Sequence, residues 1–283
     1  MIEFLQALLF GLVEGITEWL PISSTGHMIL LNEFVKLNVS AEFWDMFLVV
    51  IQLGAIFAVI VLFWNKIFPF GKKGNVHPLK ENGMLSYIKT DIFMMWFKIV
   101  AACIPAIIIV LLHLDDVFEE MFYNPVCVAI ALIVFGIGFI VIENMHKNIT
   151  PRITTLAEIG FQTALIIGLF QLIAAIFPGT SRSGATILGA LLIGVSRTVA
   201  AEFTFFLAIP VMLGDSLLKI VKFGFSFTGA EAMILITGMI TAFAVSLLVI
   251  KFLMGYIKKH DFKIFGWYRI VLGVIVLVYF AIC

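Results

Sequence analysis

Two polar stretches interrupt segments that are otherwise apolar: EGITEWLPISSTGH at residues 14–27 and PGTSRSGAT at residues 178–186. The first lies within the apolar segment 3–36 and the second within the segment 158–196. Proline and glycine end helices, and irregular polar backbone is tolerated at membrane depth only against protein or in a watered cavity. We therefore interpret each segment as a re-entrant hairpin, in which a helix, a polar loop and a second helix enter and leave on the same side.

The composition around these two stretches is that of a membrane protein. Of the 283 residues, 62% are hydrophobic and 13% are charged, and the mean hydropathy is +1.14. Soluble domains carry about 25% charged residues, so the composition excludes an ordinary cytosolic enzyme. The 18 basic and 18 acidic residues balance, and no basic stripe stands apart from the apolar runs, so we expect no nucleic-acid partner.

Six further stretches are long enough to cross a bilayer, because a helix needs about 20 apolar residues to do so. These stretches are residues 42–64, 90–112, 123–143, 200–222, 231–253 and 266–283. The expected fold class is therefore an all-α polytopic membrane protein. It has about six transmembrane helices plus two re-entrant helix–loop–helix hairpins, which makes about ten helices.

The charges of the connecting loops predict which side of the membrane each loop occupies. Loops 65–89, 144–157 and 251–266 carry lysine or arginine, whereas loop 113–122 carries four acidic residues and no basic one. By the positive-inside rule the three basic loops face the cytoplasm and the acidic loop faces outward. Six membrane crossings with two re-entrant hairpins put all four loops on the sides that their charges predict, and they put both termini outside. Charge alone also allows the two interrupted segments to cross, and only their interruptions favour re-entry.

An internal repeat relates the two halves of the chain. A shift of 157 residues aligns Ala7 with Ala164, Gly11 with Gly168, Pro21 with Pro178 and Ser24 with Ser181, and a shift of 160 aligns 42–43 with 202–203 and 53–54 with 213–214. We expect a single membrane domain, 1–283, with a first repeat at 1–143 and a second at 144–283. Each repeat has one hairpin and three crossings, so the second is inverted. Inverted repeats place a site near mid-depth, where broken helices meet.

The first polar stretch carries two carboxylates. Glu14 and Glu18 are four residues apart and share a helix face, which the small residues Ala7 and Gly11 continue so that another helix can approach closely. Carboxylates inside a membrane are costly and indicate function, although a capping pair at a helix end is the alternative. The hydroxyls of Ser23, Ser24 and Thr25 and the imidazole of His27 follow, and they supply nucleophiles and a group that exchanges protons near neutral pH.

The second polar stretch has the residue types of an anion site. Arg182 offers a forked donor for phosphate, and glycines and hydroxyls surround it. A helix break with a snorkelling arginine is the alternative, which the position of Arg182 inside a polar loop disfavours. The hydroxyls expected to bind substrate phosphate are those of Ser23, Thr25, Thr180, Ser181, Ser183 and Thr186. Gln52 is expected to stand just behind the site, and Asp215 is either part of it or at a water-facing helix end.

Both stretches closely resemble the two signature motifs of the bacterial undecaprenyl pyrophosphate phosphatase family, the bacitracin-resistance type. The similarity extends through VVIQLGAIFAVIVLFW (49–64) and GVSRTVAAEFTFFLAIPVM (194–212) and covers nearly the whole chain. The resemblance implies an inner (plasma) membrane hydrolase that converts undecaprenyl diphosphate to the monophosphate carrier of peptidoglycan synthesis and confers bacitracin resistance. It implies catalytic roles for Glu14, Glu18, Ser24, His27 and Arg182. Asp215 departs from the family, which has an apolar or small residue there.

The chemistry keeps several alternatives open at this level. Ser24 is the favoured nucleophile with His27 or Glu18 as its base, but a phospho-histidine route and direct attack by water are not separated from it. Glu14 and Glu18 are alternatively ligands of a divalent cation, Mg²⁺ or Ca²⁺. An inverted-repeat transporter or lipid flippase is the rival class, and a non-catalytic lipid-binding scaffold is a third.

The partners expected are a prenyl diphosphate substrate and the membrane lipid around it. The sequence is silent on oligomeric state, so a homodimer is compatible with it. Access to the site is predicted from the outer face, because the polar groups of the first hairpin need water. The matching face of the second hairpin carries Ala164, Gly168, Gln171 and Ala175, which are expected to pack dry.

Overall fold

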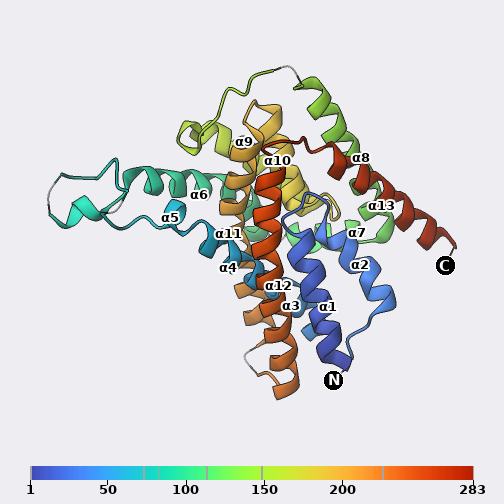
Figure 1. Cartoon of the computed structure of the whole chain (residues 1–283). Coiled ribbons are helices and arrows are strands. Elements are labelled where there is room, and N and C mark those ends of the chain that lie inside the picture. Colours follow the sequence, from blue (N-terminus) through green and yellow to red (C-terminus); the bar gives the residue numbers. More distant parts are fainter. Residues whose placement is uncertain are drawn as a thin grey trace.

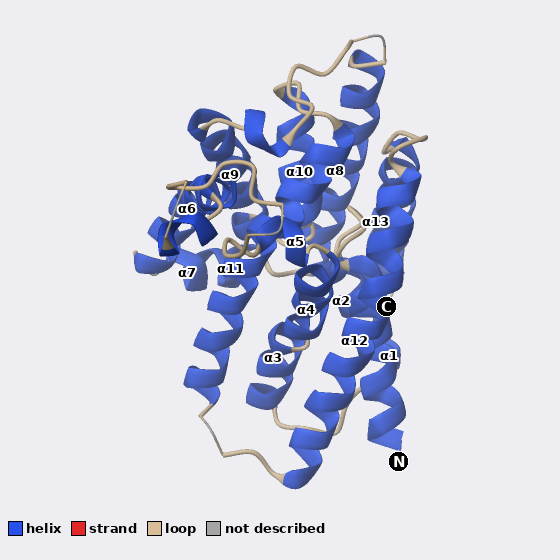
Figure 2. Cartoon of the chain, turned by 60° about the vertical axis from the view of Figure 1, so that its left-hand side comes forward, coloured by secondary structure: helices blue, strands red, loops and turns tan. Residues whose placement is uncertain are grey.

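The computed structural model describes residues 2–72, 74–81, 83–112, 114–147, 149–224 and 226–282, without the side chains of Asp115, Asp116 and Glu119. Within these ranges the chain is helical, and three isolated β-bridges are its only extended pairings. Figure 2 shows the described residues as helices joined by loops. The predicted all-α fold class is therefore confirmed.

Two helical hairpins occupy the positions predicted from the interrupted segments. Hairpin 1 consists of α1 (Ile2–Thr17) and α2 (Ser24–Phe34), and hairpin 2 consists of α9 (Phe161–Ile176) and α10 (Arg182–Leu192). The two helices that leave the hairpin tips begin in the same way. Ser23 (φ 72°) precedes α2 and caps the amide of Gly26, and Ser181 (φ 68°) precedes α10 and caps the amide of Gly184.

The register of the two tips differs by one residue from the predicted alignment. Ser23, not Ser24, has the conformation and capping role of Ser181, because the second tip has one residue more between its proline and its capping serine. The predicted alignment of Ser24 with Ser181 is therefore wrong. The residue of the second tip at the position equivalent to Ser24 is Arg182. The division into repeats 1–143 and 144–283 stays a prediction.

Among the described residues, six helical spans are long and apolar enough to cross a membrane. They are α3 (Ala41–Val50) with α4 (Gln52–Leu62), then α6 (Thr90–Leu111), α8 (Pro125–Met145), α11 (Arg197–Phe223), α12 (Gly229–Tyr256) and α13 (Lys263–Ile282). The predicted spans are confirmed, and the chain is a multi-pass membrane protein. The connections hold the short helices α5 (Trp64–Ile67), η1 (Met84–Tyr87), α7 (Leu114–Phe122) and η2 (Leu156–Glu158). The acidic segment 113–122, interpreted above as a loop, thus contains a helix.

Small residues let the hairpins pack tightly against the long spans. A Cβ atom added to Gly11 of α1 would lie 2.5 Å from the carbonyl oxygen of Gly238 on α12. A Cβ atom added to Gly168 of α9 would lie 2.2 Å from the carbonyl oxygen of Ala102 on α6. The expectation that Gly11 admits a close helix neighbour is confirmed, and each hairpin is held by a span from the other half of the chain.

The two hairpins open at opposite ends of the bundle. At the hairpin-1 end lie the start of α1, the start of α3 and the connection from α11 to α12, whereas the connections α8–α9, α10–α11 and α12–α13 lie at the hairpin-2 end (Figures 1 and 2). The hairpin tips meet between the two ends, and this meeting point is where the polar residues of both motifs come together.

Candidate functional site

A buried arginine and a serine join the two hairpin tips. Ser183 of hairpin 2 donates a hydrogen bond to the carbonyl oxygen of Glu18 in hairpin 1 (3.0 Å). Arg269 of α13 has no exposed surface. It donates to the carbonyl oxygens of Pro21 (3.4 Å), Gly179 (3.1 Å) and Thr180 (2.6 Å). The tips are thus held by one cation that reaches both loops.

Three residues of the two motifs form a direct chain of hydrogen bonds. The Ser24 hydroxyl donates to Oε2 of Glu18 (2.8 Å), and Nη2 of Arg182 donates to Oε1 of the same carboxylate (2.7 Å). Ser24 and Arg182 are the first residues of α2 and α10, so the two helix starts face each other across Glu18. This trio combines a nucleophile, a proton acceptor and a phosphate-binding cation.

Several polar groups beside the trio are buried with no hydrogen-bond partner among the described residues. They are Oε1 of Glu14, Nη1 of Arg182, and both the nitrogen and the oxygen of the Gln171 side-chain amide. Gln171 is only 3% exposed. Buried polar groups are nearly always satisfied by protein or by ordered water, so these four positions are available to water or to the polar group of a ligand.

Two adjoining cavities lead to these groups. The first, of about 310 Å³, is lined by polar residues that include Glu18, Ser24, Gln171 and Arg182 and by apolar residues of α6 and α11. The second, of about 420 Å³, includes Glu14 and extends to Trp44, Tyr123, Lys219 and Lys222. The two share the lining residues Ser24, Thr25, Gln52, Val110 and Asp215, so they form one continuous space.

His27 is placed differently from the other predicted catalytic residues. Its Nδ1 lies 2.6 Å from the carbonyl oxygen of Ser23, and its Nε2 lies 2.7 Å from the hydroxyl of Tyr268, whose ring stacks on the imidazole. A carbonyl only accepts, so Nδ1 carries a proton and Nε2 accepts from the tyrosine. Both ring nitrogens are engaged within the protein, and His27 is not among the described residues that line the two cavities. This geometry favours Glu18 over His27 as the acceptor for the Ser24 proton.

The hydroxyls predicted to bind phosphate divide into two groups. Thr25 and Ser181 line the cavities. Ser23, Thr180, Ser183 and Thr186 are buried and are absent from the described cavity lining. Ser23 caps α2, Ser183 binds the tip of hairpin 1, and Thr186 donates to the carbonyl oxygen of Arg182 (2.9 Å). For these three, a phosphate-binding role does not fit the structure, because their hydroxyls are already bonded to backbone groups of the protein.

Of the four hairpin-2 residues expected to pack away from water, two pack against protein and two line a cavity. Ala164 and Gly168 are buried, and Gly168 packs against α6 as expected. Gln171 and Ala175 instead line the cavity that contains Glu18 and Arg182. Gln171 stands 157 residues after Glu14, so the repeat itself points to it as a site residue. Arg269 was also overlooked, and the only signal for it was a lone arginine inside the apolar span 266–283.

Metal ligands were expected at Glu14 and Glu18. Both oxygens of Glu18 are engaged by Ser24 and Arg182, whereas Oε1 of Glu14 is open. Within the described part of the chain, no three or more His, Cys, Asp or Glu side chains gather into a metal site. The protein side chains on their own therefore offer one open carboxylate ligand here.

Comparisons with known proteins show the family of the chain. The chain is 64% identical to an undecaprenyl-diphosphatase of Desulfitobacterium hafniense over 281 residues, which cover 99% of this chain and 97% of the relative. It is 60% identical to an undecaprenyl-diphosphatase of Enterococcus faecalis over 99% of this chain and 98% of the relative. The family model described as "Bacitracin resistance protein BacA" matches residues 7–275, which include both hairpin tips and the arginine that joins them. The chain therefore belongs to the bacitracin resistance protein BacA family.

Proposed function

We propose that this chain is an integral membrane phosphatase that hydrolyses undecaprenyl diphosphate to undecaprenyl phosphate and inorganic phosphate. The observation that carries the proposal is the bonded trio of Ser24, Glu18 and Arg182 on the wall of a cavity between apolar helices. The relatives named undecaprenyl-diphosphatase share most of its sequence. The product is the carrier used in peptidoglycan synthesis, so this activity recycles the carrier and confers bacitracin resistance.

In the first chemical step Ser24 attacks the terminal phosphorus. Its Oγ forms the new P–O bond while Oε2 of Glu18, already 2.8 Å away, accepts the hydroxyl proton. The bond between the terminal phosphorus and the bridging oxygen breaks, and undecaprenyl phosphate leaves with the bonding electrons. In the second step water attacks the phosphorus of the phosphoserine and the P–Oγ bond breaks. The Ser24 oxygen takes back the proton held by Glu18, the freed carboxylate accepts the proton of the water, and inorganic phosphate departs.

Charge neutralisation accounts for most of the catalysis in phosphoryl transfer. Arg182 keeps Nη2 on Glu18 and has Nη1 buried with no partner among the described residues, so that nitrogen is free to donate to a phosphate oxygen. The open amide of Gln171 lines the same cavity and can donate a second hydrogen bond. The apolar residues of α6 and α11 along this cavity suit the first isoprene units of the lipid.

A divalent cation, Mg²⁺ or Ca²⁺, is part of the proposal as a substrate-bridging ion. Hard cations take carboxylate and phosphate oxygens as ligands, and Oε1 of Glu14 is an open carboxylate oxygen beside the cavity. Such an ion would supply further neutralisation of the diphosphate charge. Loss of activity in a strong chelator and its return with either ion supports this role, and full activity of metal-free protein contradicts it.

We further propose that the site opens to the outer face of the bacterial inner membrane. The continuous cavity runs from Ser24 at the hairpin tips toward Lys219 and Lys222, near the end of α11. This is the hairpin-1 end of the bundle, opposite the connections α8–α9 and α12–α13, whose basic residues the positive-inside rule puts inside.

The decisive experiment measures phosphate release from farnesyl diphosphate by the purified protein in detergent, where no membrane gradient exists. We expect multiple turnovers by the unaltered chain and none by Ser24→Ala. A transporter, a flippase or a lipid-binding scaffold would release no phosphate under these conditions. Retention of activity by Ser24→Ala with loss in His27→Asn would instead support the phospho-histidine route.

A further inference from the structure

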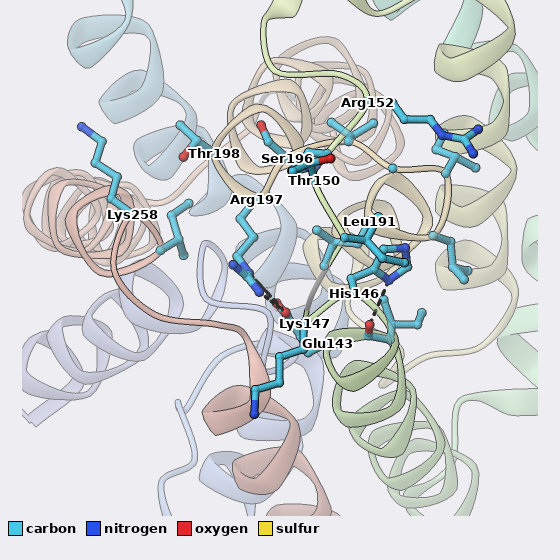
Figure 3. Close-up of a pocket in the computed structure, with 18 residues that line it drawn as sticks. Glu143, His146, Lys147, Thr150, Arg152, Leu191, Ser196, Arg197, Thr198 and Lys258 are labelled. Atoms are coloured by element: carbon cyan, nitrogen blue, oxygen red, sulfur yellow. Dashed lines mark hydrogen bonds and ion pairs between the residues drawn. The ribbon is translucent and has the colours of Figure 1, made fainter.

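A third and larger cavity lies at the hairpin-2 end of the bundle. Its volume is about 530 Å³, and it lies between the C-terminal end of α8, the α8–α9 connection, the α10–α11 connection and the end of α12 (Figure 3). It shares no described lining residue with the two cavities at the hairpin tips. Leu191 and Leu192 at the end of α10 line it, whereas Arg182 at the start of α10 faces the candidate active site.

Uncompensated positive charge surrounds this pocket. Arg197 is paired with Glu143, which is buried and also accepts a hydrogen bond from the amide of Phe262 (3.0 Å). Lys147, Arg152 and Lys258 are exposed and form no ion pair within the described part of the chain. Figure 3 shows these three side chains on different sides of the pocket, with Arg197 and His146 between them. Three unpaired cations thus surround a pocket in which Glu143, the one carboxylate among the described lining residues, is already paired.

The pocket combines this charge with an apolar wall and a fixed backbone. Isoleucine, leucine and valine side chains contribute to the lining, as do the hydroxyls of Thr150, Ser196 and Thr198. The amide of Arg152 donates to the carbonyl oxygen of Gly194 (2.8 Å), and Ile153 pairs with Val195, so the stem of Arg152 is anchored at the rim. A cationic ring over an apolar wall suits an amphiphile, with its charged group at the rim and its hydrocarbon below.

We propose that this pocket binds the phosphate group of an anionic membrane phospholipid. Basic pockets between transmembrane helices on the cytoplasmic side bind anionic head groups, and three flexible cations there neutralise a phosphodiester well. Two of the segments that form the pocket, 144–157 and the one that contains Lys258, belong to loops that the positive-inside rule assigns to the cytoplasm. The proposal concerns residues outside the candidate active site, so it stands or falls separately from the proposed phosphatase activity.

The first test measures thermal stability of the purified chain in neutral detergent. Phosphatidylglycerol is added to the unaltered chain and to the triple variant Lys147→Gln, Arg152→Gln, Lys258→Gln. A matched triple variant, Lys80→Gln, Lys251→Gln, Lys259→Gln, removes three exposed charges outside the pocket. We expect phosphatidylglycerol to raise the Tm of the unaltered chain and the matched variant by about 3 °C or more, and to leave the pocket variant unchanged. Equal responses of the two triple variants would overturn the proposal.

Occupancy is tested directly by cysteine protection. Thr150→Cys is placed in a background with Cys103→Ser, Cys127→Ser and Cys283→Ser, and its rate of reaction with a water-soluble thiol reagent is measured in detergent. We expect phosphatidylglycerol to slow the reaction at least about threefold, with no effect of phosphatidylcholine. Equal protection by inorganic phosphate would identify a site for free anions and overturn the assignment to a lipid. The absence of protection by phosphatidylglycerol would show that this pocket does not bind the lipid at all.

Discussion

Glu18 accepts a hydrogen bond from Ser24 on one carboxylate oxygen and from Arg182 on the other, and this arrangement makes it the central residue of the site. Glu18→Gln keeps the size of the side chain but removes the proton acceptor for Ser24. We expect kcat to fall by about 10²–10⁴-fold, the usual contribution of a positioned general base. Glu202→Gln is the matched control, because Glu202 is equally buried at 7% and pairs with Lys66, and neither residue lines the two cavities at the hairpin tips. Comparable losses in both variants would mean that buried ion pairing, not proton transfer, explains the effect.

Arg182 is expected to contribute through its geometry as well as its charge. Charge-assisted hydrogen bonds in partly desolvated sites are worth about 1.5–3 kcal/mol, so Arg182→Ala should lower kcat/KM at least about tenfold. Arg182→Lys should recover only part of this, because an ammonium cannot hold Glu18 and a phosphate oxygen with a fixed fork. Steady-state kinetics on monodisperse protein provides the measurement. Turnover by Arg182→Ala close to that of the unaltered chain would contradict the assignment.

Gln171 offers a prediction in which stability and activity move in opposite directions. Its amide is buried with neither polar atom bonded to any described residue, so replacing it with an apolar side chain removes a desolvation cost. Gln171→Leu should therefore raise Tm or leave it unchanged, while kcat/KM falls about fivefold or more through loss of a hydrogen bond to phosphate. An increase in stability with full activity would remove Gln171 from the site.

At the scale of residues, the sequence predicts which side chains carry the chemistry, but it does not predict which way each side chain points. Glu18, Ser24 and Arg182 stand out in the sequence because charged and nucleophilic groups are rare in apolar segments. Ser23 and Ser183 belong to the same motifs, yet their hydroxyls cap a helix and hold a tip, which depends on positive φ at Ser23 and on contact between distant loops. Arg269 could not be assigned from spacing, because its acceptors lie in both tips and are far from it in the chain.

At the scale of elements, the pairing of α9 with α6 depends on the absence of a side chain at Gly168. In Gly168→Ala the new Cβ would lie 2.2 Å from the carbonyl oxygen of Ala102, so one helix must shift. We expect a loss of about 1–3 kcal/mol in the free energy of unfolding, together with loss of activity as hairpin 2 moves.

Gly214→Ala in α11 is the matched control, because a Cβ there meets no described atom within 4 Å. Alanine favours a helix over glycine by about 1 kcal/mol, so this variant should be neutral or more stable. Denaturant or thermal unfolding in detergent provides both values. Equal stability of the two variants would contradict the tight α6–α9 contact.

The sequence best predicts those helices and hairpins that are marked by a single strong sequence feature. The six spans follow from length and hydropathy, and the hairpins follow from proline, glycine and hydroxyl residues inside apolar segments. Helix α7 was hidden because its acidic charges suggested a loop. The apolar residues of Leu114–Phe122 nevertheless recur at Leu114, Val117, Phe118 and Met121, which is helical spacing. For this segment, the spacing of the apolar residues predicts the helix, whereas the acidic composition does not.

At the scale of the whole molecule, the two ends of the bundle differ in what they offer to a lipid. The hairpin-1 end has the continuous cavity that reaches Ser24, and the hairpin-2 end has the basic pocket. The amide of Arg152 donates to the carbonyl oxygen of Gly194 beside the basic pocket, whereas the polar tip of hairpin 1 borders the cavity that contains Glu18. In the proposed orientation, a substrate released outside the cell would meet the cavity, and a phospholipid of the inner leaflet would meet the pocket.

This arrangement predicts the membrane orientation of both ends in one experiment. Thr25 lines both cavities at the hairpin tips, and Thr150 lines the basic pocket, so each reports on one end. Each threonine is replaced by cysteine in the background that lacks Cys103, Cys127 and Cys283, and intact cells are treated with a membrane-impermeant thiol reagent. The positive-inside rule predicts that the basic loops face the cytoplasm, so we expect Thr25→Cys to react in intact cells and Thr150→Cys to react only after the membrane is opened. A prenyl diphosphate should protect the cysteine at position 25 and leave the one at position 150 reactive. The reverse pattern of labelling would put the candidate active site on the cytoplasmic side, where it could not recycle a carrier released outside.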